Sequence, residues 1–255
     1  MKKIGLVLSG GGVRGFAHLG LLKYLDELGI KIDAVSGVSA GAIVGALYAS
    51  GMPPDDILAV MKKNKYFSFS DFSVRKEGLF SMQPLLKALQ KLIPEDSFEK
   101  LSLKLFITAT DFTSNTSVVF SKGKLFNAVI ASASVPVLFE PVKMDSKLFV
   151  DGGLLNNFPV EPLLKDCDFI IGSHVNKIEE TVASAARLSK IRILETCFHM
   201  AIAETVYPKA GKCNIFIEPP LHQFSMFDTA SADKIFKTGY ENAIKYKDQL
   251  LAFLH

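Results

Sequence analysis

The segment 36–41, Ser-Gly-Val-Ser-Ala-Gly, restricts the possible folds of this chain more than any other stretch. An apolar, strand-like run precedes it, and small residues at 42–49 predict a helix directly after it. A serine on so sharp a strand-to-helix turn needs very small neighbours, and Gly37 and Gly41 satisfy that need. The G-x-S-x-G pattern in this context predicts a nucleophile elbow that presents Ser39, although a surface serine on an ordinary turn would give the same five residues.

A glycine-rich loop follows the first expected strand. Residues 2–8 form a mostly apolar run without alternation, which predicts a strand buried on both faces. The run leads into Ser-Gly-Gly-Gly-Val-Arg-Gly at 9–15, and leucines at helical spacing then predict a helix that ends at Gly29. A strand, a glycine-rich loop and a helix in this order present backbone N–H groups to an anion.

One interpretation of this loop is a dinucleotide site, because Gly10, Gly12 and Gly15 fit the pattern G-x-G-x-x-G. Such a site expects an acidic residue at the end of the second strand, but Asp33 stands near that strand's beginning and the serine turn stands at its end. No Walker-type lysine follows the loop either. The sequence therefore gives little support to a nucleotide cofactor.

The favoured interpretation is an oxyanion hole formed by the backbone N–H groups of Gly11, Gly12 and Val13. In a parallel sheet, the carboxyl ends of the first and second strands lie at the same edge. We therefore expect this loop and the Ser39 turn to face each other across one crevice.

An aspartate stands at the end of a later strand. Residues 147–151 form a short apolar strand that delivers Asp151 to its carboxyl end, and Gly152 and Gly153 then turn the chain away. An aspartate in such a place is either a turn former or an acid or base, and the residues alone leave both roles open. Other strands are expected at 103–110, 116–120 and 168–175.

Composition excludes several classes of protein. The 255 residues are 49% apolar and 22% charged, which fits one sizeable domain over 1–255, with a motif-bearing core at about 2–175 and helical support at about 176–255. The net charge of +3 without a basic stripe predicts no nucleic-acid partner. No apolar run reaches the roughly 18 residues of a membrane-spanning helix, and the run behind the first lysines is too short for a signal peptide, so we expect a cytoplasmic protein.

Three motifs occur in a fixed order: the glycine loop at 10–15, the serine turn at 37–41, and Asp-Gly-Gly at 151–153. A small-residue segment at 131–136 lies between the last two. This order resembles that of the patatin-like phospholipase family, and the run Gly-Gly-Gly-Val-Arg-Gly-Phe-Ala-His-Leu-Gly at 10–20 is most similar to its bacterial branch. The resemblance implies a three-layer α/β/α fold with a mostly parallel central sheet.

The resemblance also implies a Ser–Asp dyad, with Ser39 as nucleophile and Asp151 as its base. The expected substrate is an acyl lipid, such as a phospholipid or a lysophospholipid, and the reaction would pass through an acyl-enzyme on Ser39 without a cofactor or metal. An aspartate with an ordinary pKa of about 3.9 is a weak base, so burial should raise this pKa. The remaining motif residues would support the site: Gly10, Arg14, Gly15, Gly37, Gly41, Gly152 and Gly153.

Several alternatives stay open. Arg14 could bind a lipid phosphate, or it could brace the glycine loop through backbone carbonyls. A Ser-His-Asp triad of the α/β-hydrolase type could use Ser39, Asp151 and His174, which follow one another in the right order, although the serine turn comes unusually early in the chain. An acyltransferase would use the same serine, and a lipid-binding module without activity would keep the same fold. A homo-oligomer is also compatible with the sequence.

The segment 64–82 carries scattered aromatic residues among serines and charges. It is interpreted either as a long connection pinned to the core or as an apolar lid that makes transient contact with a membrane. Farther along, we expect an amphipathic stretch at 178–206, a strand-like segment at 214–218 and a last helix at 232–253.

Overall fold

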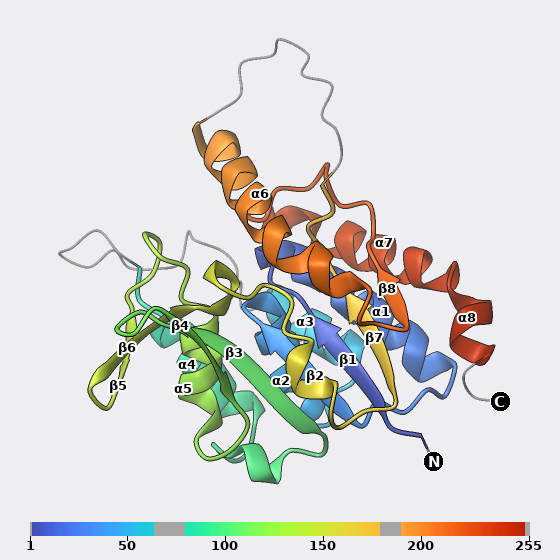
Figure 1. Ribbon diagram of the computed structural model, residues 1–255, viewed down its shortest axis with the longest axis horizontal. Helices are drawn as coiled ribbons and strands as arrows, with labels where there is room; N and C mark the ends of the chain where they lie inside the picture. Colours follow the sequence, from blue (N-terminus) through green and yellow to red (C-terminus); the bar gives the residue numbers. More distant parts are fainter. Residues whose placement is uncertain (1, 64–79, 179–189, 253–255) are drawn as a thin grey trace.

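The computed structural model describes residues 2–63, 80–178 and 190–252, and these residues form three layers with a central sheet between helices (Figure 1). Among the described residues, eight strands make up the sheet, in the order β5-β6-β3-β2-β1-β7-β8 with β4 beside β3. The strands are β1 (Ile4–Leu8), β2 (Ala34–Val38), β3 (Lys104–Asp111), β4 (Thr116–Phe120), β5 (Val142–Met144), β6 (Lys147–Asp151), β7 (Phe169–Ser173) and β8 (Ile215–Ile217).

The sheet is mostly parallel, which confirms the predicted fold class. The pairs β1–β2, β2–β3, β1–β7 and β7–β8 are parallel, whereas β4, β5 and β6 form an antiparallel group at one side. The chain leaves β1 toward β2 and β3 on one side and later adds β7 on the other. The carboxyl end of β1 is therefore a topological switch point, the place where open α/β sheets bind ligands.

Both faces of β1 are buried, as its unbroken apolar run predicts. Leu6 and Leu8 belong to the large core under the helices α1 and α2, whereas Val7 belongs to a smaller core with Phe158 and with Val206 of α6. The helices are α1 (Phe16–Glu27), α2 (Ala40–Ala49), α3 (Pro54–Lys63), α4 (Gln83–Leu92), α5 (Leu125–Ser132), α6 (Lys190–Ala210), α7 (Ala232–Ile244) and α8 (Lys247–Ala252).

The C-terminal third contains the strand expected at 214–218 as well as helices. Strand β8 pairs with β7 and extends the central sheet, so this part of the chain contributes to the middle layer. The single helix expected at 232–253 is two helices, α7 and α8, with a break at 245–246. Helix α7 packs closely on α1. A Cβ added to Gly239 of α7 would lie only 2.2 Å from the carbonyl oxygen of Ala17 in α1, so the glycine is what permits this approach.

Most of the aromatic segment expected at 64–82 lies outside the described residues. Its last part is described: the N–H of Phe80 donates to the carbonyl of Leu138, and the Phe80 and Phe139 rings lie 6.3 Å apart. Within the described ranges, we find no helix with the length and apolar character needed to cross a bilayer.

Candidate active site

Ser39 occupies a strained turn between β2 and α2. Its φ of 53° and ψ of −122° lie in a region that residues other than glycine rarely adopt. A Cβ added to Gly41 would lie 2.2 Å from the carbonyl oxygen of Leu8, and one added to Gly37 would lie 2.4 Å from the carbonyl oxygen of Gly41. The small residues of the motif therefore let the turn pack directly against the end of β1.

The hydroxyl of Ser39 donates a 2.6 Å hydrogen bond to Oδ2 of Asp151. The other carboxylate oxygen, Oδ1, accepts a 2.7 Å hydrogen bond from the N–H of Gly153. The backbone of Asp151 is fixed as well, because its N–H donates to the carbonyl of Ser134 and its carbonyl accepts from the hydroxyl of Thr110. Both carboxylate oxygens are thus held in place beside the serine.

The environment of Asp151 changes its acidity. The residue is only 2% exposed, and burial raises its pKa from the ordinary value to about 7. The hydrogen bonds from Ser39 and Gly153 favour the ionised form and partly oppose that shift. A carboxylate with a pKa near neutrality is a much better proton acceptor than an ordinary aspartate, and it remains substantially ionised at pH 7.

The glycine loop lies against the serine turn, as the parallel arrangement of β1 and β2 predicts. A Cβ added to Gly10 would lie 3.0 Å from Cβ of Ser39, so the two turns are in direct contact. Of the three N–H groups expected to form an oxyanion hole, that of Val13 donates a 2.9 Å hydrogen bond to the carbonyl of Met226. This leaves Gly11 and Gly12 as the candidate donors in this conformation.

Arg14 is buried and directs its guanidinium away from solvent. Its Nε donates a 2.8 Å hydrogen bond to the carbonyl of Phe224, and its Nη1 lies 3.4 Å from Oδ1 of Asn176. These contacts match the bracing role rather than phosphate binding, but the braced carbonyl belongs to the C-terminal third. Asn176, which sequence reasoning missed, in turn donates to the carbonyl of Gly10.

His18 is a buried, hydrogen-bonded residue behind the loop, as a histidine in the first turns of this helix is expected to be. Because a carbonyl can only accept, Nε2 of His18 carries the proton and donates to the carbonyl of Ser9 at 2.9 Å. Nδ1 of His18 then accepts from the hydroxyl of Ser173 at 2.8 Å. Burial lowers the pKa of His18 to about 4, so the ring is neutral at pH 7 and holds the start of the glycine loop.

His174 lies on the face of the sheet that carries the smaller core. Its Nδ1 lies 2.7 Å from Oε1 of Glu218, and its ring packs against those of Phe158, Tyr207 and Phe216. Among the described residues, Ser39 bonds to Asp151 and His174 bonds to Glu218, and the two side chains do not hydrogen-bond to each other. The structure therefore does not assemble the three side chains of the alternative triad.

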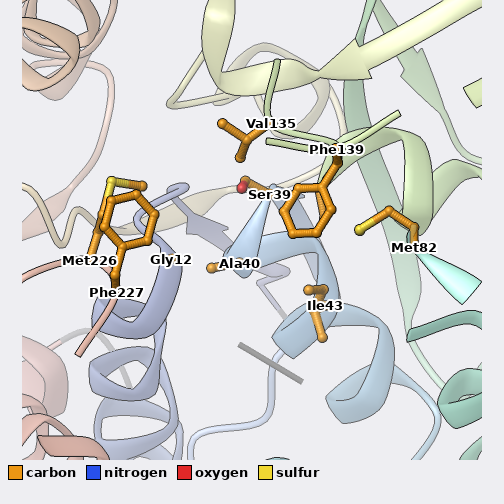
Figure 2. Close-up of a pocket in the computed structure, with 10 residues that line it drawn as sticks. Gly12, Ser39, Ala40, Ile43, Met82, Val135, Phe139, Met226 and Phe227 are labelled. Atoms are coloured by element: carbon orange, nitrogen blue, oxygen red, sulfur yellow. The ribbon is translucent and has the colours of Figure 1, made fainter. Parts of the chain in front are cut away.

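A cavity of about 50 Å³ opens beside Ser39. Figure 2 shows Met226 and Phe227 on one side of the serine and Phe139 and Met82 on the other. Apart from the serine, the side chains lining it are apolar. Met226 and Phe227 come from a loop that carries no recognisable motif, so sequence reasoning had no signal to find them. Within the described ranges, no three His, Cys, Asp or Glu side chains are grouped to hold a metal ion.

Comparison with known proteins agrees with this geometry. A sequence model of the family described as patatin-like phospholipase matches residues 6–164. An NTE family protein of Mycobacterium tuberculosis is 34% identical over 169 residues, which cover 66% of this chain and 29% of that protein. Lysophospholipase NTE1 of Candida glabrata is 30% identical over 271 residues, which cover 93% of this chain and 16% of that protein.

The fold has a counterpart among solved structures. VipD from Legionella pneumophila superposes with a TM-score of 0.54 and 17% sequence identity, over 98% of this chain and 67% of VipD. At that identity the likeness concerns the fold alone. The chain spans less than a third of the length of either sequence relative described above.

Proposed function

The chain belongs to the patatin-like phospholipase family, and from that premise we propose that it hydrolyses acyl esters of lipids, with Ser39 as nucleophile and Asp151 as general base. The observation that carries the proposal is the 2.6 Å hydrogen bond from the serine hydroxyl to a buried carboxylate. The name of one relative, a lysophospholipase, supports a phospholipid or lysophospholipid as substrate.

The proposed reaction begins when Asp151 takes the proton of the Ser39 hydroxyl as its Oγ attacks the ester carbonyl carbon. The carbonyl oxygen becomes negative, and the N–H groups of Gly11 and Gly12 stabilise it beside the positive end of α1. The tetrahedral intermediate then releases the alcohol, which takes the proton from Asp151, and an acyl-Ser39 ester remains.

Water completes the cycle. Asp151 accepts a proton from a water molecule, whose oxygen attacks the acyl carbon and forms a second tetrahedral intermediate. When the Ser39 oxygen leaves, it regains the proton from Asp151, and the fatty acid is released. If another alcohol replaces the water, the same residues catalyse acyl transfer, which is the second candidate activity.

The remaining motif residues have supporting roles in this proposal. Gly37 and Gly41 permit the turn at Ser39, and Gly152 permits the turn after Asp151, since a Cβ on Gly152 would lie 2.2 Å from the carbonyl oxygen of Thr108. Gly10, Gly15 and Gly153 leave room for neighbouring side chains around the two turns, because a Cβ on any of them would lie 2.4–2.8 Å from a side-chain atom. We further propose that 1–255 acts as one domain, because the large core contains residues from β1 and from α7.

Labelling with a fluorophosphonate, followed by mass mapping of peptides, tests the proposal. We expect an adduct on Ser39 that is absent in Ser39→Ala and greatly slowed in Asp151→Asn. The control is Ser50→Ala, because Ser50 follows α2 and, within the described part of the chain, its hydroxyl donates to the nearby carbonyl of Leu47. A wild-type protein that takes no label at Ser39 would refute the proposed nucleophile. Product analysis with and without an alcohol acceptor separates hydrolysis from acyl transfer.

A further inference from the structure

We propose that Asn176 is a positioning residue, which aims the backbone N–H of Gly11 at the oxyanion that forms during the reaction. The inference rests on the proposed function and adds a residue to it. Asn176 lies beyond the 6–164 match to the family, in the segment that follows β7. It is only 3% exposed and does not line the cavity beside Ser39, so it acts through the glycine loop rather than on the substrate.

The side-chain amide of Asn176 binds the glycine loop. Its Nδ2 donates a 2.8 Å hydrogen bond to the carbonyl oxygen of Gly10. Because a carbonyl can only accept, this bond fixes which end of the amide faces the loop. The other end, Oδ1, faces Arg14, whose Nη1 lies 3.4 Å away. The hydroxyl of Ser9 donates to the same carbonyl of Gly10 at 3.1 Å, so two donors hold this carbonyl.

The direction of the Gly10 carbonyl sets the direction of the N–H of Gly11. The two groups belong to one trans peptide unit, in which the C=O and the N–H point in opposite directions. Asn176 follows β7, whereas Ser39 follows β2, and these two strands flank β1 on opposite sides. A carbonyl that points toward Asn176 therefore turns the N–H of Gly11 toward the side of the serine.

The packing of the glycine loop agrees with this arrangement. A Cβ on Gly10 would lie 3.0 Å from Cβ of Ser39, and a Cβ on Gly11 would lie 3.0 Å from Oδ1 of Asn176. The loop is thus enclosed between the serine turn and the amide. Within the described ranges, the N–H of Gly11 donates to no protein acceptor, whereas that of Val13 is already engaged. The N–H of Gly11 is therefore available to an oxyanion.

Loss of the amide should weaken the oxyanion hole without removing it. Removal of one donor that is aimed at an oxyanion lowers kcat by about 10²–10³. The hydroxyl of Ser9 still holds the carbonyl of Gly10 in a variant of Asn176, so the expected loss is smaller. We expect Asn176→Leu, which has a similar size and no donor, to lower kcat/KM about tenfold.

The experiment compares an ester with its thiono counterpart, in which sulfur replaces the carbonyl oxygen. We measure kcat/KM of the full chain with p-nitrophenyl octanoate and with the matching thiono ester. Sulfur is a weak hydrogen-bond acceptor, so the N–H groups of the hole stabilise the thiono intermediate much less. Asn176→Leu should therefore lower kcat/KM about tenfold for the ester and less than about threefold for the thiono ester.

Asn176→Ala provides a second variant if Asn176→Leu does not fold, and the melting temperature of each variant checks folding. The matched control is Asn242→Ala. Asn242 is also a buried asparagine, but it belongs to α7 and its side chain makes no hydrogen bond to the glycine loop within the described part of the chain. This control should keep the wild-type ratio of kcat/KM for the two esters, whatever it does to stability.

The contrary results have different meanings. Unchanged kcat/KM in the folded Asn176 variants, or an equal loss with both esters, overturns the positioning role alone when Ser39 is still labelled in the wild type. An equal loss would mean that Asn176 supports the fold without aiming the N–H of Gly11. If the wild type hydrolyses neither ester and takes no label on Ser39, the proposed function fails and this inference fails with it.

Discussion

The hydroxyl of Ser39 donates a 2.6 Å hydrogen bond to Asp151, a residue 112 positions later in the chain. The serine comes from a strained turn after a parallel strand, and the aspartate comes from the end of an antiparallel one. Strand β6 overlaps only the last residues of β3, from Ala109 to Asp111, so its end still lies near the carboxyl edge of the parallel strands. This short overlap is what brings the carboxylate to the serine.

The first prediction concerns the pH dependence of activity. Asp151 must be ionised to accept the serine proton, and its pKa is raised to about 7. We therefore expect kcat/KM to rise with pH through a midpoint near 7 and to level off above it, as measured by ester hydrolysis from acid to mildly alkaline pH. The same rise of kcat/KM with pH must persist in His174→Ala, because a histidine that acted as the base would give a rise with a similar midpoint. A rate independent of pH across this range would contradict the role of Asp151.

The second prediction concerns stability. An aspartate with a raised pKa binds more protons in the folded state than in the unfolded state between its ordinary pKa and about 7, so its contribution to the free energy of unfolding falls as pH rises through that window. Asp151→Asn removes this cost, because the amide stays neutral. We expect a higher melting temperature for Asp151→Asn than for the wild type at pH 8, and a gain that shrinks as pH falls toward 4.

A gain that stays constant at all pH values would show that the substitution acts through packing rather than through ionisation. Asp111→Asn provides a control in which the change in stability should have the opposite sign. The pKa of Asp111 is lowered to about 2, mainly by its bond to Lys147, so its removal should destabilise the protein near neutral pH.

The third prediction separates the dyad from the alternative triad. His174 contacts Glu218 and three aromatic rings, whereas the hydroxyl of Ser39 bonds to Asp151. We expect His174→Ala to keep kcat within a few-fold of wild type and to lower the free energy of unfolding by about 1–3 kcal/mol, because it leaves a buried gap and removes the contact between the imidazole and Glu218. Kinetics and chemical denaturation of the same preparation check both parts. A loss of kcat of about a hundredfold or more in folded protein would favour the triad.

The fourth prediction concerns the backbone contact beneath the serine turn. A methyl group on Gly41 would lie 2.2 Å from the carbonyl oxygen of Leu8, and neither backbone segment can move freely. Gly41→Ala should destabilise the protein by about 3 kcal/mol or more and abolish labelling of Ser39. Gly211→Ala is the matched control, since nothing lies within 4 Å of its added Cβ and its backbone is unstrained, and it should change stability by about 0.5 kcal/mol at most. Equal stability of the two variants would disprove the close contact.

Much of the architecture could be predicted from the chain alone, because it depends on neighbours in sequence. The unbroken apolar run of β1, the helical spacing of the leucines in α1 and the small residues around Ser39 each specify a local structure. The parallel pairing of β1 and β2 then brings the glycine loop and the serine turn to one edge, as expected. The sequence also indicated Asp151 at the end of a strand, but it left open whether the residue makes a turn or serves as a base.

Only the tertiary structure decided which distant groups meet. It placed Asp151 on Ser39 through a short antiparallel strand, turned His174 toward Glu218, and attached Arg14 to the carbonyl of Phe224. It also made the loop around Met226 a wall of the cavity, and the carbonyl of Met226 accepts a hydrogen bond from the N–H of Val13. The reason is physical: periodicity and residue size act within a few positions of the chain, whereas these contacts depend on how whole elements pack across the sheet. The sequence by itself therefore determined the local parts of this site. The packing of the strands and helices, together with the loop at 224–227, determined what each part touches.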